Sequence, residues 1–565
     1  MHRIRTPFQL AVCLFAATVV LAASQSTPPN QASGNTKNDS NQSKQTATLK
    51  GKVTNAVTND ALRKVTLILT KTSGGGITKA DTDDKGEFSF QDIEPGRYYL
   101  FAERTGFTRQ AYGARGNALV GVGLSFSAGQ EVKDIVFKLQ PNSVISGKVL
   151  DADGEPIPQT MVMALRVMYQ RGKKQLLPLS TSMTNDLGEY RLANLKAGRY
   201  SVSATPMNVG IGVAGTSNQP PSDRPEHSNV TTFYPGVREK ELASPIEVGV
   251  GAEARGMDIR MVQVDTVRVK GKLDIPSGKQ AIVYLTPKGA GVSGLISRIQ
   301  TMAVAQQDGT FEIKGVSPGS YVLSATGIDG LSSLGVPQAV EVADKHISGL
   351  VLPASGNGEL SGTFRIEDKL TANVKDIQVT IEPQEIFSVS PPKVAVGDDG
   401  KFTLKDVPPD RYLVHHTGGA ESLYMKSVRY NGLEVGDDGL DLSGGVKGSV
   451  DILMSDKGGQ VDGSVVGDDG NPVSGVTVVL IPDSRRFSLF KEMTTDQRGA
   501  FSFKGITPGD YKLLAWEDID TGAYQDPEFL KQFVGKSESV SLRESDRKVV
   551  SLKMIPIESA STHKL

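Results

Sequence analysis

The sequence predicts an all-β protein built as a tandem array of about five β-sandwich domains, and three observations lead to this fold class. The chain has 565 residues, more than the roughly 250–300 residues that a single hydrophobic core serves. One stretch returns along the chain, as DDKGEFSFQDIEPGRYYLFAE from Asp83 and as DQRGAFSFKGITPGDYKLLAW from Asp496. The composition includes 61 glycines and only 6% aromatic residues, which suits strands joined by many turns.

The repeated unit has about the size of a small domain. Further copies of the stretch start at Asn185, Gln306 and Gly397, and each of the five copies follows a strand-like segment that contains a glycine. The distance from this glycine to the tyrosine of the copy is about fifty residues in the pairs Gly51 and Tyr98, Gly147 and Tyr200, Gly271 and Tyr321, Gly362 and Tyr412, and Gly463 and Tyr511. The whole unit returns about every hundred residues, which exceeds the ~20–50 residues of solenoid repeats and indicates separate domains.

Each part of the repeated stretch has a physical reason. An Asp or Asn followed by Gly predicts a tight hairpin, because glycine reaches positive φ without a Cβ clash. Phe88 and Phe90 alternate with polar residues, so we expect both rings to face the core. Pro then Gly fits a type II turn, and we expect a corner that is looser or of another type where Ala197 or Asp410 replaces one of the pair. The tyrosine that follows is expected to bury its ring and donate a hydrogen bond, as in a tyrosine corner.

The repeat also predicts the domain boundaries. The expected order is 1–24 signal peptide, 25–45 disordered linker, 46–141 first sandwich, 142–265 second sandwich with a long loop insertion, 266–356 third sandwich, 357–457 fourth sandwich, 458–556 fifth sandwich and 557–565 tail. The junctions between sandwiches are expected near Asn142, Thr266, Asn357 and Gly458, and limited proteolysis should cut there.

The N-terminus has the pattern of an export signal. Arg3 and Arg5 precede an apolar run from Phe8 to about Ala23, which is shorter than the ~20 apolar residues that span a bilayer. Small residues stand before a cleavage point at Gln25, so we expect a cleaved signal peptide and no transmembrane segment in the mature chain. The alternative is a retained anchor. The prediction places the protein in the periplasm, on the cell surface or outside the cell, and the polar segment that follows is expected to be a disordered linker.

The copies resemble a known family. The pattern G-K-V … D-x-x-G-x-F-x-[FL]-x-x-[ILV]-x-P-G-x-Y-x-[LV] is similar to the carboxypeptidase regulatory-like domain, a seven-stranded transthyretin-like β-sandwich that is related to the collagen-adhesin B-type repeat and grouped with carbohydrate-binding-like folds. The resemblance covers Thr46 to about Pro556 and is closer in copies one, two and five than in copies three and four. It implies an exported accessory module without carboxypeptidase activity, because that activity belongs to a separate catalytic domain.

The sequence offers little for catalysis. A net charge of −1 gives no basic surplus for nucleic acid, and the only cysteine, Cys13, lies inside the apolar run of the signal. His415 and His416 are the only histidine cluster, but adjacent strand residues point to opposite faces. The G-x-S-x-G match at Gly315–Gly319 falls in a corner between two strands. We therefore expect no enzyme, no catalytic residue, no cofactor and no metal. The Asp-rich turns indicate Asx turns, and calcium stays open because related adhesin repeats sometimes hold it.

The candidate recognition residues lie where the copies differ. The fifth copy continues as WEDIDTGAYQDPEFLKQF, with the only tryptophan, Trp516, and with Tyr524, and the insertion of the second copy has Phe233 and Tyr234 near its end. Flat aromatic rings beside hydrogen-bonding groups suit sugar faces, so we predict these four as carbohydrate-binding residues. The alternative is that they close the ends of sandwiches, with the helix expected from Pro527 to Val534 as the cover of Trp516.

These patterns predict an exported, non-enzymatic, multi-domain binding protein whose loops hold carbohydrate or cell-envelope glycan. The alternative is a structural spacer or a protein–protein interaction stalk that has no small ligand. The expected partners are a polysaccharide or another component of the cell envelope, and other envelope proteins. Exposed aromatic clusters would favour the first hypothesis, and buried ones would favour the second.

Overall fold

The structure is a computed structural model that describes residues 46–72, 76–114, 121–206, 226–274, 280–288, 298, 301–328, 334–354, 356–367, 374, 376–384, 392–484 and 486–556. The predicted signal peptide, linker and tail lie outside the described residues. Gln45–Leu565 forms one compact unit. In the described ranges, no helix combines the length and the apolar character that crossing a membrane requires. Strands make up most of the described structure, which confirms the all-β fold class.

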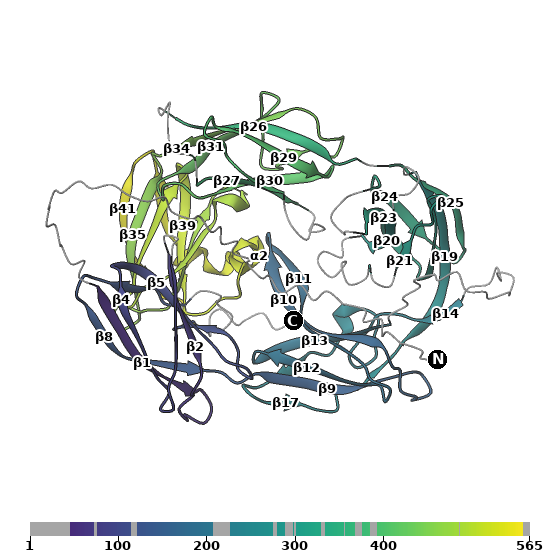
Figure 1. Cartoon of the computed structure of the whole chain (residues 1–565), viewed down its shortest axis with the longest axis horizontal. Coiled ribbons are helices and arrows are strands. Elements are labelled where there is room, and N and C mark those ends of the chain that lie inside the picture. The colour runs from purple at the N-terminus through teal and green to yellow at the C-terminus, as the bar shows by residue number, and fades with distance from the viewer. Residues whose placement is uncertain are drawn as a thin grey trace, which may run out of the picture. The chain divides into compact units, whose positions relative to one another are not determined.

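The first sandwich shows the frame of the protein (Figure 1). One sheet has the strand order β4–β1–β8, and the other has the order β3–β2–β5, with β6 and β7 both paired to β5. The strands are β1 (Ala47–Asn55), β2 (Thr66–Lys71), β3 (Ile77–Asp81), β4 (Glu87–Ile93), β5 (Gly96–Glu103), β6 (Gln110–Ala111), β7 (Leu124–Phe126) and β8 (Glu131–Leu139). Apart from the short β6, this is the expected seven-stranded sandwich.

The second and third sandwiches repeat this frame with additions. The second contains β9 (Ser143–Leu150), β10 (Thr160–Gln170), β11 (Lys173–Met183), β12 (Glu189–Leu195), β13 (Gly198–Pro206), β15 (Thr232–Phe233), the 3-10 helix η1 (Lys240–Leu242), β16 (Ile246–Val248), β17 (Glu253–Ala254) and β18 (Ile259–Arg260). The third contains β19 (Gln263–Leu273), β20 (Ala281–Pro287), β21 (Met302–Val304), β22 (Thr310–Val316), β23 (Gly319–Gly327), β24 (Gln338–Val342) and β25 (Ile347–Leu352).

The fourth sandwich adds a hairpin to the frame, and the fifth adds helical turns. The fourth contains β26 (Gly358–Ile366), β27 (Gln378–Pro383), β28 (Lys393–Ala395), β29 (Lys401–Val407), β30 (Arg411–Thr417), β31 (Tyr424–Tyr430), β32 (Leu433–Glu434), β33 (Leu440–Asp441) and β34 (Ser449–Ser455). The fifth contains β35 (Gly459–Val466), β36 (Thr477–Pro482), η2 (Phe487–Leu489), β37 (Lys491–Thr494), β38 (Ala500–Ile506), β39 (Gly509–Trp516), η3 (Ala523–Gln525), α2 (Pro527–Leu530), η4 (Lys531–Lys536), β40 (Glu538–Leu542) and β41 (Arg547–Lys553).

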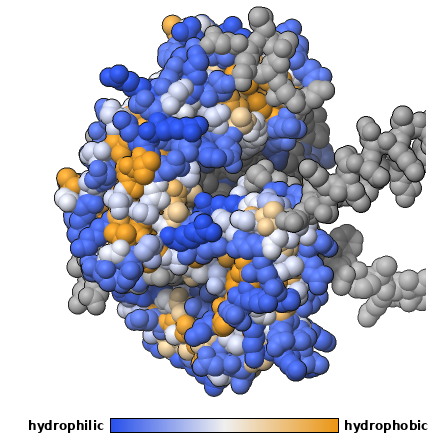
Figure 2. Space-filling view, turned by 90° about the vertical axis from the view of Figure 1, so that its left-hand side faces the viewer, coloured by the Kyte–Doolittle hydropathy of each residue, from blue (hydrophilic) through white to orange (hydrophobic). Residues whose placement is uncertain are grey.

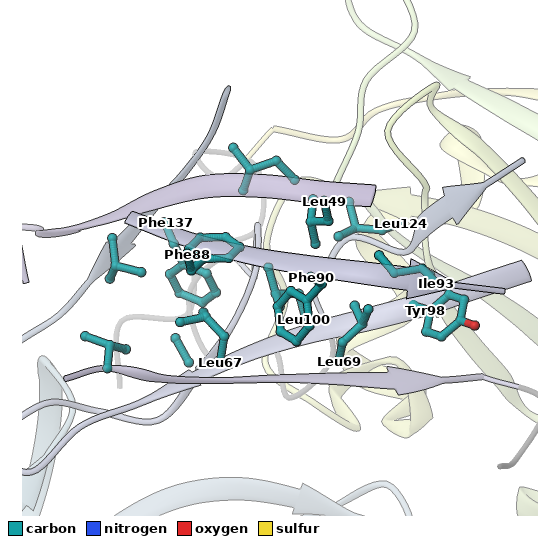
Figure 3. Close-up of a cluster of buried hydrophobic side chains, with 14 of the residues drawn as sticks. Leu49, Leu67, Leu69, Phe88, Phe90, Ile93, Tyr98, Leu100, Leu124 and Phe137 are labelled. Carbon is teal, nitrogen blue, oxygen red and sulfur yellow. The ribbon is translucent and has the colours of Figure 1, made fainter. Parts of the chain in front are cut away.

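All five sandwiches share one strand pairing and one kind of core. The opening strand pairs antiparallel with the strand of the repeated stretch and parallel with the closing strands. In the first sandwich the rings of Phe88 and Phe90 lie between the two sheets together with Leu100 (Figure 3), and all three are buried. The matching residues of the other copies are buried too, namely Tyr190, Leu192, Phe311, Ile313, Phe402, Leu404, Phe501 and Phe503. The predicted alternation is confirmed.

The glycine of each opening strand is required by close packing. A Cβ atom on Gly463 would lie 2.4 Å from the carbonyl oxygen of Val550 on the parallel closing strand and 2.5 Å from the ring of Phe501. A Cβ atom would likewise meet a carbonyl oxygen of the closing strand and a phenylalanine ring at Gly51, Gly271 and Gly362. At Gly147 it would meet the backbone of the closing segment. Only a residue without a side chain lets the aromatic ring lie against the strand.

The five corner tyrosines behave as predicted. Each is less than a tenth exposed, and each hydroxyl donates a hydrogen bond of 2.6–3.0 Å to the carbonyl oxygen four residues earlier in the chain. The turn type was predicted wrongly: Gly96 and Gly509 have φ of 152° and 157°, far from the roughly +80° of a type II turn. The corners with Ala197 and Asp410 are not looser, since their tyrosine bonds are both 2.7 Å long. Asp410 lacks the positive φ of Gly96, Gly198 and Gly509, so its corner is of another type, as one of the two predicted alternatives had it. The tyrosine hydroxyl therefore closes the corner.

The Asp-rich turns are Asx turns. The Asp83 carboxylate accepts the backbone N–H groups of Lys85 and Glu87 at 2.9 and 2.8 Å, and Asp496 accepts those of Arg498 and Ala500 at 2.9 Å each. These carboxylates stabilise the hairpin because they accept backbone N–H groups in place of backbone carbonyl oxygens, as the sequence predicted.

The insertion of the second sandwich reaches the third. Its strand β14 (Glu226–Asn229) pairs antiparallel with β19, so a segment that comes before the third sandwich in sequence extends the third sandwich's sheet. The predicted junction at Thr266 lies inside β19, whereas Asn142, Asn357 and Gly458 lie between strands. The positions of proteolytic cuts stay a prediction.

Candidate functional site

Trp516 lies at the end of β39, on the outer face of its sheet. Tyr511, Leu513 and Ala515 face the core between the two sheets of the fifth sandwich. Leu514 and Trp516 belong instead to a second buried cluster. The alternation of side chains along the strand thus turns Trp516 away from the face that Tyr511 buries, as the sequence predicted.

A helical segment covers this outer face. Asp526 is the N-cap of α2, because its side chain accepts the backbone N–H of Glu528 at 2.9 Å. The ring centroid of Trp516 lies 5.4 Å from that of Phe533, edge to face, and 6.4 Å from that of Phe529. Trp516 is 0% exposed as a result. The alternative role of the helix, as a cover, is the one that the structure shows.

Tyr524 is buried in the same cluster. Its ring lies 6.1 Å from Phe490, and its hydroxyl donates a 2.6 Å hydrogen bond to the Glu492 carboxylate. Burial, together with the Glu492 carboxylate, raises the pKa of Tyr524. An exposed stacking platform at Trp516 and Tyr524 is therefore a wrong prediction, because the apolar outer face of β39 required a cover and the loop supplied it.

Phe233 and Tyr234 lie in a different part of the chain. Tyr234 is half-buried against the core of the second sandwich, and its N–H donates to the carbonyl oxygen of Val202 at 2.8 Å. Phe233 is half-buried and exchanges two backbone hydrogen bonds with Val237, at 2.7 and 2.9 Å. The structure does not bring this pair into the Trp516 cluster, and its role in sugar binding stays a prediction.

The motif that resembles a nucleophile elbow is a corner. Ser317 lies between β22 and β23, and its carbonyl oxygen accepts the Tyr321 hydroxyl at 2.9 Å. Both flanking elements are strands, which confirms the interpretation as a turn. In the part of the chain that is described, no three His, Cys, Asp or Glu residues gather as metal ligands would.

Among the described residues, a cavity of about 270 Å³ lies between the fourth and fifth sandwiches. On one side it is lined by β30 and β31, and on the other by η2, Lys491 of β37 and the corner around Tyr511. Its apolar wall includes Leu423, Leu489 and Phe487. On the face drawn in Figure 2, by contrast, hydrophobic side chains form separate patches among hydrophilic ones, and we see no broad apolar docking surface there.

The junction that encloses this cavity is closely packed. A Cβ atom on Gly505 would lie 2.6 Å from the carbonyl oxygen of Glu421 and 2.7 Å from that of Leu423, so only glycine fits against the fourth sandwich here. Lys504 pairs with Glu421 at 2.7 Å, and the Tyr424 hydroxyl donates to Glu544 at 2.8 Å. These contacts join the fourth and fifth sandwiches beside the hollow.

Most charged groups of the cavity wall already have a partner. Lys426 contacts Glu367 and Glu544 at 2.7 and 2.9 Å. The remaining pairs are Arg486 with Asp437, Glu434 with Arg429, and His415 with Glu382. His415, and the Arg171 guanidinium that the second sandwich contributes, lower the pKa of the Glu382 carboxyl.

Lys491 and His416 differ from these paired groups. The Lys491 ammonium donates to the carbonyl oxygen of Lys504 at 2.9 Å, and among the described residues no carboxylate forms an ion pair with it. Burial lowers the pKa of Lys491. Burial, together with the nearby Lys491 and His415, also lowers the pKa of His416, which favours a neutral imidazole at pH 7.

The sequence did not predict this cavity, because its lining residues come from two sandwiches. One signal was available: His416 occupies the fourth position after the corner tyrosine, where the other copies have buried alanines, namely Ala102, Ala204, Ala325 and Ala515. A polar residue at a repeated core position marks a departure from the frame.

A family model for the carboxypeptidase regulatory-like domain matches residues 48–133, 144–212 and 460–520. No curated protein matches the chain. Solved structures that are similar include the Bacillus anthracis TIE protein, at 11% identity and a TM-score of 0.16, covering 81% of this chain and 71% of that one. The minor pilin GBS52 of Streptococcus agalactiae has 10% identity and a TM-score of 0.23, covering 41% of this chain and 99% of the pilin.

The B1B2 repeat units of the collagen-binding protein of Staphylococcus aureus have 9% identity and a TM-score of 0.13, covering 73% of this chain and 99% of the repeat pair. Structural matches at these scores carry no conclusion about function. The family match agrees with the resemblance found in the repeated stretch, and it falls on the first, second and fifth copies.

Proposed function

We propose that this chain, which carries three carboxypeptidase regulatory-like domains, is an exported, non-enzymatic binding protein that holds carbohydrate or another component of the cell envelope. The observation that carries the proposal is the cavity between the fourth and fifth sandwiches, which combines an apolar wall with hydrogen-bonding groups. The corner tyrosines, the turn aspartates and Trp516 are all engaged in the frame. Binding is therefore assigned to a junction rather than to the repeated loops.

The test is a pull-down of the full chain on insoluble polysaccharides and cell-envelope glycan, with two tryptophan variants. Leu489→Trp places a large ring at the cavity wall, whereas Val549→Trp alters a side chain that is 83% exposed on β41. We expect the wild type and Val549→Trp to bind and Leu489→Trp to lose binding. Equal binding by all three would assign recognition to another surface, such as the loop of Phe233.

The second candidate function is a structural spacer or interaction stalk with no small ligand. It is favoured by the burial of the predicted aromatic platform and by the close packing at Gly505, which joins two sandwiches as a stiff unit. If the wild type binds no glycan in the pull-down, the spacer becomes the better proposal.

A further inference from the structure

The cavity between the fourth and fifth sandwiches has an unbalanced charge. The lining side chains Lys426, Arg486, Glu434 and His415 each have an oppositely charged or carboxylate partner. Lys491 has only a carbonyl oxygen as its partner among the described residues. An ammonium group has three donors, so two N–H groups of Lys491 are left for another acceptor.

A half-buried ammonium without a counter-charge is costly. Removing the ammonium from water disfavours its charged form. A nearby carboxylate would offset this loss of hydration most directly, through a charge-assisted hydrogen bond. His416 and Lys491 both line the cavity, and an imidazole ring nitrogen can donate a hydrogen bond to an acceptor held there. The two side chains come from different sandwiches, so the acceptor position exists only at the assembled junction.

The other wall of the cavity limits the kind of anion. Leu423, Leu489 and Phe487 offer an apolar surface, and the Phe487 ring is stacked on Phe490 with an interplanar angle of 20°. A ring of this kind suits the C–H face of a sugar. A single cation matches a monoanionic carboxylate better than a doubly charged phosphate. The volume of about 270 Å³ lies just below that of sites for drug-sized ligands, so the ligand is a single sugar unit.

We propose that this cavity binds a carboxylate-bearing sugar unit, a hexuronate, with its carboxylate beside Lys491 and His416 and its ring against the apolar wall. This inference rests on the proposed function and deepens it by naming the ligand class. The hexuronate is the acidic residue of a polysaccharide chain or a free acid sugar, and the chemistry of the site is the same for both.

The experiment is calorimetric titration of the full chain with glucuronate, glucose and inorganic phosphate, followed by an oligomer of glucuronate to separate the polymer from the free sugar. Lys491→Met keeps most of the stem and removes the charge, and it should fold, because Lys491 has no ion pair among the described residues and its replacement leaves no buried carboxylate without a counter-charge. Lys553→Met is the control, because Lys553 is exposed and pairs with Asp468 at 3.0 Å.

We expect glucuronate to bind the wild type and Lys553→Met equally, and Lys491→Met at least about tenfold more weakly. Tighter binding of the oligomer than of the free sugar would identify a polysaccharide as the source, and equal binding would identify the free acid. Glucose binding as tightly as glucuronate, or phosphate binding more tightly, would overturn the hexuronate inference while leaving the proposed function in place if the pull-down succeeds. Failure of every ligand, in both the titration and the pull-down, would overturn both.

Discussion

The fourth and fifth sandwiches have the same frame and differ in the outer face of the strand that follows the corner. In the fifth, the outer positions of β39 are Leu514 and Trp516, and both are buried under helical turns. The matching positions of β30 in the fourth are His415, which pairs with Glu382, and the exposed Thr417. A strand with two apolar faces requires a second cover, whereas a strand with one polar face can border a junction.

The segments after these strands follow from that difference. In the fifth sandwich the segment returns over the sheet as η3, α2 and η4, and in the fourth it forms β31 and β32, which extend the opposite sheet. The inner positions match, since Tyr412 and Val414 correspond to Tyr511 and Leu513. The repeat therefore preserves the inner positions at the corner tyrosine and two residues later, and it departs from the core pattern at His416. The outer positions differ as well: they are covered in the fifth sandwich, whereas His415 borders the cavity in the fourth.

The largest expected effect comes from removing the Trp516 ring, on which the helical cover of β39 packs. Trp516→Ala should destabilise the fifth sandwich by ~3–5 kcal/mol, the usual cost of deleting a large aromatic ring from a core. The measurement is hydrogen exchange of β39 and β36 in the full chain, since a multi-domain protein does not unfold in one step. Thr417→Ala, at the matching exposed position, should change stability by less than about 0.5 kcal/mol. Equal effects at the two positions would remove the distinction between the faces.

A milder variant separates ring packing from hydrogen bonding at the same site. The indole nitrogen of Trp516 is buried, and no hydrogen-bond partner for it is present in the described structure. Trp516→Phe therefore deletes volume and no hydrogen bond, and it should cost less than Trp516→Ala.

The next effect tests the frame that the two sandwiches share. Gly463→Ala and Gly362→Ala should each cost ~1–3 kcal/mol, because a Cβ atom would lie 2.4 Å from a carbonyl oxygen of the parallel strand in both copies. Gly535→Ala, which has open space around its Cβ position, is the control and should be near neutral in chemical denaturation. A much smaller loss at Gly362 than at Gly463 would show that the two cores are not equivalent.

A smaller effect tests the corners. Tyr412→Phe and Tyr511→Phe each remove one hydroxyl-to-carbonyl hydrogen bond, of 2.7 and 2.6 Å, and each should cost about 0.5–1.5 kcal/mol. The corner of Tyr412 has Asp410 where that of Tyr511 has Gly509. Similar losses in local exchange stability would support closure by the hydroxyl, and a loss confined to Tyr511 would restore a role for the glycine.

Short-range patterns predicted most of this fold and little of its candidate site. Alternation placed Phe88 and Phe90 in the core, and the corner tyrosines were correctly assigned to structure. The type II turn was wrong because Gly96 has a φ of 152°, which the Pro-Gly pattern alone does not specify. The cavity is lined by His416 of the fourth sandwich and Lys491 of the fifth, and no local pattern encodes which faces of two domains meet.

The smallest expected effect is a spectroscopic one, and it tests the cover without a mutation. Trp516 is the only tryptophan, so the fluorescence of the full chain reports on this site alone. An indole that is 0% exposed should emit at short wavelength, resist quenching by iodide and show no shift when polysaccharide is added. An exposed Trp516 would instead emit at longer wavelength, be quenched by iodide and shift its emission when polysaccharide is added. Phe529→Ala opens the cover beside the ring and should make Trp516 sensitive to iodide, whereas Phe487→Ala, at the cavity, should leave it protected. Quenching in the wild type would mean that the outer face of β39 is open like that of β30, and the contrast between the two sandwiches would then be lost.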